Sequence, residues 1–167
     1  IHKIMKIMIF LHGTAIMHKN GFGKTPEERS QQIEENETSV NQYEDYIPVD
    51  DAVSKLIKWQ QQGAEISYLS SHESALDVEK DKLVLKKYVF PEGEVYYRNN
   101  GESYASIAEK VMPDILIEDD CKSIGGEIEM TYPHINPQKK GKIKSIVVKE
   151  FSGIDNLPDS IETLINY

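Results

Sequence analysis

Apolar residues gather in short runs along the chain, and most of the segments between them have the spacing of amphipathic helices. The first run, residues 4–11, is apolar at every position except Lys6. An uninterrupted run of this length is typical of a strand that is covered on both faces in a parallel sheet. The pattern predicts further strands at 64–69, 94–97, 114–117, 128–132 and 143–149.

The helical pattern is clearest directly after Pro48. Asp50 is a candidate N-cap, and Gly63 is well placed to end the helix. Val53 and Leu56 fall at helical spacing between them. Further helices are predicted at 73–88, 102–111 and 158–166. This alternation of buried strands and amphipathic helices predicts an α/β fold, a three-layer α/β/α sandwich with a mostly parallel, Rossmann-like sheet.

Residues 15–47 interrupt this alternation with a long polar stretch. From 26 to 37 the residues are mostly helix formers with few apolar side chains, which predicts a solvated helix. Residues 21–25 look like part of a phosphate-binding P-loop, but the first glycine of that motif falls on His18 and the loop lies far from a strand end. The chain is therefore predicted to be a single domain, 1–167, in which 15–47 is a candidate small flap or cap.

The composition is that of an ordinary folded domain. Hydrophobic residues make up 39% and charged residues 28% of the 167 positions, a length with room for one core. The formal charge is −9, from 19 basic and 28 acidic side chains, which disfavours non-specific binding to nucleic acids or anionic lipids. A local cationic pocket could still hold one small anion. We therefore expect neither a nucleic-acid partner nor a membrane partner.

Cys121 is the only cysteine, so an internal disulfide and a cysteine-rich zinc site are excluded. A single thiol suits a reducing compartment. No segment approaches the roughly 20 apolar residues of a membrane helix. The first apolar run is interrupted by Lys6 and lacks the cleavage site of a signal peptide. We expect a cytoplasmic protein, and the sequence leaves its oligomeric state open.

Three of the predicted strands end in polar residues. These residues are His12-Gly13-Thr14, Ser70-Ser71-His72 and Glu118-Asp119-Asp120. Because ligands of parallel α/β folds bind at the carboxyl ends of the strands, we predict that the three groups share one edge of the sheet. Two acids directly after a buried strand are hard to explain by packing. Asp119 and Asp120 are therefore candidate ligands for a metal ion.

In order and spacing these segments resemble the motifs of the haloacid dehalogenase superfamily over most of the chain. That pattern has a hydrophobic strand followed by Asp-x-Asp-Gly-Thr, a strand ending in Ser or Thr, a lysine, and a strand ending in acids. Residues 7–14, Ser70, Lys110 and 113–120 fall on these motifs in turn. The resemblance implies a phosphohydrolase fold with a phosphate site and a Mg²⁺ site. The implied phosphate ligands are Gly13, Thr14, Ser70, Ser71 and Lys110, and the implied metal ligands are Asp119 and Asp120.

Several of these residues also have a purely structural interpretation. Ser70 and Ser71 could end a strand and cap the helix that is predicted to start near Glu73. Lys110 could be a solvated lysine in the last turn of its helix, where a cation is favoured. The residues alone leave both interpretations open.

The first motif departs from the family pattern at both acids. The nucleophilic aspartate falls on Phe10, which has no lone pair and is interpreted as core packing. The acid/base aspartate falls on His12. Losing covalent catalysis and a metal ligand together should remove most of the rate enhancement. His12 is a candidate proton acceptor or nucleophile, because histidine exchanges protons near neutral pH. The alternative is a histidine that fills the turn after a core strand.

We interpret the chain as a degenerate phosphohydrolase-fold protein that keeps a phosphate- and Mg²⁺-binding cleft but lacks aspartyl-phosphate catalysis. Its expected partner is a small phosphorylated molecule. One alternative is an active phosphatase or nucleotidase that uses His12 and a metal ion held by Asp119. A second alternative is a non-catalytic interaction module. The leading interpretation rests on position 10, where a carboxylate is needed to form the phosphoenzyme.

Overall fold

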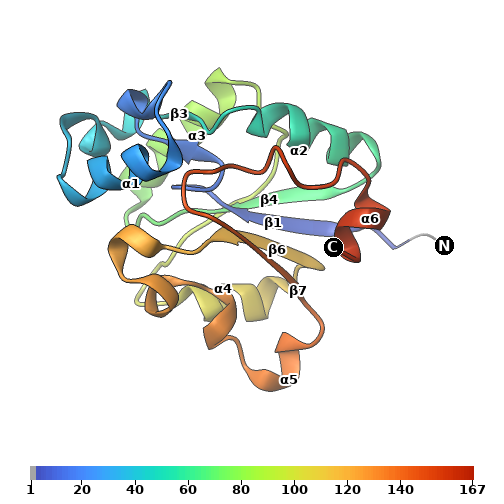
Figure 1. The fold of residues 1–167 in the computed structure, drawn as a ribbon. Coiled ribbons are helices and arrows are strands. Elements are labelled where there is room, and N and C mark those ends of the chain that lie inside the picture. The colour runs from blue at the N-terminus through green and yellow to red at the C-terminus, as the bar shows by residue number, and fades with distance from the viewer. Residues whose placement is uncertain (1–2) are drawn as a thin grey trace.

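The computed structural model describes residues 3–167 and has a five-stranded sheet at its centre (Figure 1). The strands are β1 (Lys6–Phe10), β4 (Glu65–Leu69), β5 (Val95–Tyr96), β6 (Ile115–Asp119) and β7 (Lys144–Val148). They lie in the order β5-β4-β1-β6-β7, and every neighbouring pair is parallel. Because β1 pairs with β4 on one side and β6 on the other, the three strands with polar ends are parallel neighbours, as predicted.

Helices cover both faces of this sheet, which confirms the predicted three-layer sandwich (Figure 1). One layer contains α2 (Ala52–Gln61), α3 (Ala75–Lys87) and α6 (Ile161–Ile165), and the other contains α4 (Tyr104–Val111) and α5 (Pro137–Lys140). The side chains of β1 alternate between the layers. Ile7 and Ile9 pack in one cluster with Trp59 of α2, whereas Met8 and Phe10 pack in another with residues of α4. The apolar run at the start of the chain is therefore continuous because both faces of β1 are covered.

Between β1 and α2 the chain forms a small substructure beside the end of β1. Two short strands, β2 (Ile16–Met17) and β3 (Ile47–Pro48), pair antiparallel with each other. The helix predicted in this region is present as α1 (Pro26–Glu34), shorter than expected. The idea that 15–47 is a flap or cap stays a prediction.

The helix α1 is less solvated than its sequence suggested. Arg29 is only 4% exposed. Its guanidinium donates hydrogen bonds to the carbonyl oxygens of Gly21 and Phe151 at 2.9 and 2.8 Å. A buried arginine that joins distant backbone segments gives this polar helix a fixed place on the domain.

The strand predicted at 128–132 is wrong. The stretch forms two short 3₁₀ turns, Gly126–Glu129 and Tyr132–His134. The buried carboxylate of Glu118 accepts hydrogen bonds from the backbone N–H groups of Thr131 and Tyr132 at 2.7 and 2.9 Å. Because a side chain satisfies these donors, this segment does not need a neighbouring strand.

The predicted end of α2 is confirmed, whereas its start lies one residue later than predicted. Gly63 follows the end of α2 with φ of +98°, as the sequence predicts. The N-cap position belongs to Asp51, not to Asp50, whose carboxylate instead accepts a hydrogen bond from Arg29 at 3.0 Å. The side chain of Ser74 caps α3, so neither serine at the end of β4 does so.

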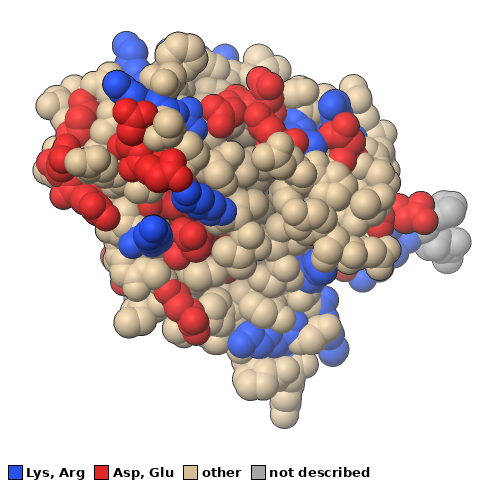
Figure 2. Space-filling model, in the orientation of Figure 1, with Lys and Arg blue, Asp and Glu red and all other residues tan. Residues whose placement is uncertain are grey.

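Figure 2 shows the surface of the molecule in the orientation of Figure 1. Acidic side chains gather at the end of the molecule that carries α1, with lysines and arginines scattered among them. This distribution agrees with the net charge of −9. Every helix within residues 3–167 is too short or too polar to cross a lipid bilayer.

Candidate functional site

The carboxyl ends of β1, β4 and β6 border one cavity of about 320 Å³. The strand-end residues singled out in the sequence that line it are His12, Gly13, Ser71, His72 and Asp119. Ser70 is fully buried. The remaining lining includes aromatic rings and acids, among them Phe10, Tyr43, Tyr46, Tyr104, Phe151, Glu129 and Glu150. The structure thus brings the first, second and fourth sequence motifs to one place.

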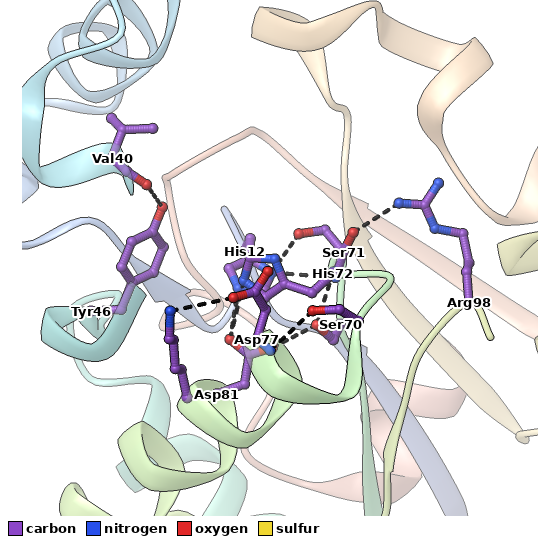
Figure 3. A network of polar contacts seen from close by, with 11 residues as sticks. His12, Val40, Tyr46, Ser70, Ser71, His72, Asp77, Asp81 and Arg98 are labelled. Atoms are coloured by element: carbon purple, nitrogen blue, oxygen red, sulfur yellow. Dashed lines mark hydrogen bonds and ion pairs between the residues drawn. The ribbon is translucent and has the colours of Figure 1, made fainter. Parts of the chain in front are cut away.

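A buried aspartate holds His12 in position (Figure 3). The Nε2 atom of His12 lies 3.0 Å from Oδ1 of Asp81, on α3. Its Nδ1 atom lies 2.8 Å from the hydroxyl oxygen of Ser71. The other carboxylate oxygen of Asp81 accepts a hydrogen bond from the Ser70 hydroxyl at 2.5 Å. An aspartate, a histidine and a serine therefore form a continuous hydrogen-bonded chain at the end of β1.

The sequence did not predict Asp81 as a site residue, because no carboxylate that could orient His12 lies near it along the chain. The signal is the position of the acid on its helix. Val78, Val84 and Leu85 are buried on α3, and Asp81 lies three or four residues from each of them. An acid on the apolar face of a helix is rarely left without a partner, since its burial is costly.

His72 completes this cluster. Its Nε2 atom lies 3.6 Å from Oδ1 of Asp81, and its ring packs against those of His12 and Tyr43, with centroids 4.6 and 4.3 Å apart. Burial lowers the pKa of His72, and the neighbouring His12 lowers it further, against the opposing effect of Asp81. The lowered pKa favours the neutral form of the His72 imidazole.

Asp119 is buried at the end of β6. One carboxylate oxygen accepts a hydrogen bond from the Thr14 hydroxyl at 2.7 Å, and the other accepts one from the backbone N–H of Cys121 at 3.0 Å. Burial raises the pKa of Asp119 to about 6, and these hydrogen bonds only partly offset that effect. Gly13 has φ of +90°, and a Cβ atom there would lie 3.2 Å from the carboxylate. In this structure Thr14 therefore holds the Asp119 carboxylate by a hydrogen bond, and Gly13 leaves room for it.

The raised pKa of Asp119 predicts a pH-dependent stability. The folded protein holds this proton more tightly than the unfolded chain, whose aspartate titrates near the ordinary 3.8. The free energy of unfolding should therefore fall, by on the order of 2–3 kcal/mol, as the pH rises from about 4 to above 6. Asp119→Asn removes this contribution, so the variant should lose less stability across the same interval. Urea denaturation of both proteins at several pH values, with a chelator present, tests this, and parallel curves would contradict it.

Lys110 does not line the cavity, so its role toward phosphate stays a prediction that this position does not favour. Helix α4 begins at the cavity with Tyr104 and runs back toward the other edge of the sheet, so its last turn points away. The Lys110 side chain is 70% exposed and pairs with Glu102 at 2.6 Å. Basic groups near the cluster include Arg98, which donates to the backbone oxygen of Ser71 at 2.8 Å, and Lys80, which lies over the Tyr43 ring.

The side chains of Ser70 and Asp120 already make hydrogen bonds to other groups of the protein. The Ser70 hydroxyl donates to Asp81 and accepts the backbone N–H of His72 at 3.1 Å. Asp120 accepts the backbone N–H groups of Lys122 and Glu150 at 3.2 and 3.3 Å and is not part of the cavity lining. Their roles toward phosphate and metal stay predictions, which these contacts do not favour.

Phe10 is packed core, as interpreted from the sequence. Its side chain belongs to the apolar cluster between the sheet and α4. Its ring meets that of Tyr104 edge-on, at 5.4 Å between centroids. Burial raises the pKa of Tyr104 to about 12, so its hydroxyl remains protonated.

The residues present do not fit the Mg²⁺ site that the resemblance implies. Magnesium prefers a set of oxygen ligands. Phe10 and His12 stand in place of two carboxylates, and both oxygens of Asp119 already accept hydrogen bonds. Glu150, the other buried acid of the cavity, is bound by two serine hydroxyls. Magnesium at Asp119 therefore stays a prediction that this donor set does not favour.

No family model matches this sequence, and no curated protein matches it. Solved structures do resemble the fold. The class C acid phosphatase from Bacillus anthracis with tungstate bound has a TM-score of 0.58 and 13% identity, over 92% of this chain and 70% of that one. A chain of the Pnkp1/Rnl/Hen1 complex has a TM-score of 0.54 and 16% identity, over 89% of this chain and 47% of that one. A chain of the Pnkp1/Rnl/Hen1 RNA repair complex gives 0.54 and 16%, over 88% of this chain and 43% of that one.

This chain spans somewhat less than half the length of the two matching chains from the Pnkp1/Rnl/Hen1 structures. At such low identity the likeness concerns the fold alone. The likeness to the acid phosphatase shows that the two proteins share an α/β fold with a mostly parallel central sheet.

Proposed function

We propose that this phosphoesterase-type fold binds a small molecule at the carboxyl edge of its sheet and forms no aspartyl-phosphate. Phe10 is the observation that carries the proposal. At the end of β1, where the family has its attacking carboxylate, this chain has a phenyl ring that is 5% exposed and packed against Tyr104. A phenyl ring supplies neither a nucleophile nor a metal ligand.

The cavity favours a ligand with an apolar or aromatic part, because aromatic rings make up much of its lining. Its charged groups are the acids Asp119, Glu129 and Glu150, and no lysine or arginine of residues 3–167 lines it. A phosphate group would meet these acids without a countercharge unless a cation were bound beside it. The small phosphorylated partner is therefore a proposal that depends on such a cation.

The proposal predicts negligible phosphatase activity. Turnover of 4-nitrophenyl phosphate with Mg²⁺ should stay far below the roughly 1 per second of a slow ordinary enzyme. The assay compares the wild-type protein with Asp119→Asn, with and without Mg²⁺. Turnover at or above that rate that disappears in Asp119→Asn would contradict the proposal.

A second candidate, a hydrolase that uses His12, is favoured by one observation. Asp81 gives His12 the orienting carboxylate that general bases use, and Ser71 places a hydroxyl on its other nitrogen. In the same assay the phosphatase or nucleotidase that uses His12 and a metal ion held by Asp119 requires turnover that vanishes in both His12→Asn and Asp119→Asn. Turnover that vanishes only in His12→Asn would indicate a hydrolase that uses His12 without that ion. The third alternative, an interaction module, stays a prediction, and the likeness to chains of an RNA repair complex identifies no partner.

A further inference from the structure

Two histidines and an aspartate from three separate elements converge at one side of the cavity (Figure 3). His12 follows β1, His72 follows β4, and Asp81 lies on α3. One ligand atom from each side chain lies within 4.8 Å of the other two. The Asp81 side chain is 1% exposed, and those of His12 and His72 are 14% and 11% exposed.

We propose that His12, His72 and Asp81 bind a divalent transition-metal ion of the zinc class. The ligand atoms are Nε2 of each imidazole and Oδ1 of the carboxylate. Oδ1 lies 3.0 Å from Nε2 of His12 and 3.6 Å from Nε2 of His72. Ligands at about 2.0–2.2 Å from a tetrahedral ion are separated from one another by roughly 3.3–3.6 Å. The second separation matches that value and the first is slightly shorter, while all three ligand atoms lie within 4.8 Å of one another. Side-chain shifts of less than about 2 Å would therefore bring the three atoms to tetrahedral spacing.

His72 provides an independent observation. Its Nε2 atom is buried and has no hydrogen-bond partner in the structure. A buried polar atom without a partner destabilises a protein, so such atoms are uncommon. A metal ion at the centre of the cluster would satisfy this nitrogen, and the neutral form of the imidazole is the form that binds metals.

The remaining ligand atoms are already oriented by hydrogen bonds. In this structure Nδ1 of His12 accepts the backbone N–H of Ser71 at 3.4 Å, which leaves the ring proton on Nε2, toward Asp81. An ion at Nε2 would take the place of that proton, and an Nδ1 proton could then be accepted by the Ser71 hydroxyl, 2.8 Å away. The Ser70 hydroxyl bonds Oδ2 of Asp81 at 2.5 Å and leaves Oδ1 for the ion. Hydrogen bonds of this kind fix the tautomer and the orientation of metal ligands.

The ligand set also indicates which ion binds and what it does. Two imidazoles with one carboxylate suit zinc-class ions, whereas magnesium prefers oxygen alone. Three protein ligands leave a tetrahedral ion one open position. His12 and His72 line the cavity, so a water or the anionic group of a ligand can reach that position. The ion supplies the positive charge that no lysine or arginine of the described residues brings to the lining.

The test titrates the whole chain, stripped with a chelator, with Zn²⁺ alone by isothermal calorimetry. We expect one bound equivalent and a higher thermal midpoint, because an ion that binds only the folded state stabilises it. His72→Gln should weaken binding by more than the roughly 10–100-fold that the loss of a supporting hydrogen bond costs. Ser71→Ala should weaken it by about 10–100-fold.

His134→Gln is the matched control, because His134 is exposed and lies outside the cluster. It should bind Zn²⁺ as the wild-type protein does. His72 makes no hydrogen bond through Nε2, so His72→Gln is expected to fold. NMR of the wild-type imidazoles during the titration needs no variant, and shifts should appear at His12 and His72. Absence of stoichiometric binding, unchanged affinity in His72→Gln, or shifts confined to other histidines would overturn the proposal.

Discussion

Replacing Phe10 by aspartate should lower the free energy of unfolding by at least about 3–5 kcal/mol and still not produce a phosphatase. The phenyl ring fills the apolar cluster between the sheet and α4 and packs against Tyr104. Its removal leaves a cavity, and the new carboxylate enters surroundings that disfavour its ionised form. His12, which occupies the second acid position, is already tied to Asp81 and cannot replace the missing aspartate.

Chemical denaturation and a Mg²⁺-dependent phosphatase assay on the same preparation test this result. Phe10→Leu is the control, because it keeps an apolar side chain and should lose less stability. The double change Phe10→Asp with His12→Asp rebuilds both acids of the motif and should do better with Mg²⁺. It also sets a second carboxylate against Asp81, so it should need the ion to fold well. Robust turnover of the single variant at unchanged stability would show that position 10 is not packed core.

Gly93→Ala should be among the most destabilising single changes in this chain. A Cβ atom at Gly93 would lie 1.9 Å from the backbone carbonyl oxygen of Ile66 on β4, which no side-chain motion can relieve. Either β5 separates from β4 or the sheet edge distorts. We expect a loss of about 4 kcal/mol or more, the range reserved for severe steric conflict. The backbone hydrogen bonds from Tyr68 to Glu94 and from Ser70 to Tyr96 should break with it.

Gly141→Ala is the matched control for Gly93→Ala. Gly141 has φ of −68° and open space around its Cβ position. Alanine there should leave stability unchanged or raise it by up to about 1 kcal/mol, since it restricts the unfolded chain. Urea denaturation of both variants, with hydrogen exchange of the amides of Tyr68 and Ser70, measures the difference. Equal stabilities would refute the close approach of Gly93 to β4.

The position of Lys110 shows that the order of motifs along the sequence does not by itself place a residue at the cavity. The family pattern requires a lysine between the second and fourth motifs, and Lys110 satisfies that order. In a right-handed parallel fold, however, the helix before β6 runs opposite to the strands, so only its first turn reaches the carboxyl edge. Tyr104 stands in that first turn, and Lys110 stands in the last. The direction of the helix, which follows from the topology, therefore places Lys110 away from the cavity even though its position in the sequence matches the motif.

The sequence by itself determined the layers of this protein, the parallel neighbours around β1 and the absence of a carboxylate at position 10. These three features follow from local hydrophobic periodicity and residue identity. Both can be determined from the sequence without knowledge of the tertiary structure. Only the tertiary structure decided that Asp81 meets His12 across 69 positions of sequence, and that His72 joins them. Such a meeting depends on how α3 is rotated against the sheet, and that rotation is set by the packing of the whole apolar face. The position of Asp81 on the apolar face of α3 can be recognised in the sequence, but its two histidine partners cannot, because they follow strands that lie elsewhere in the chain.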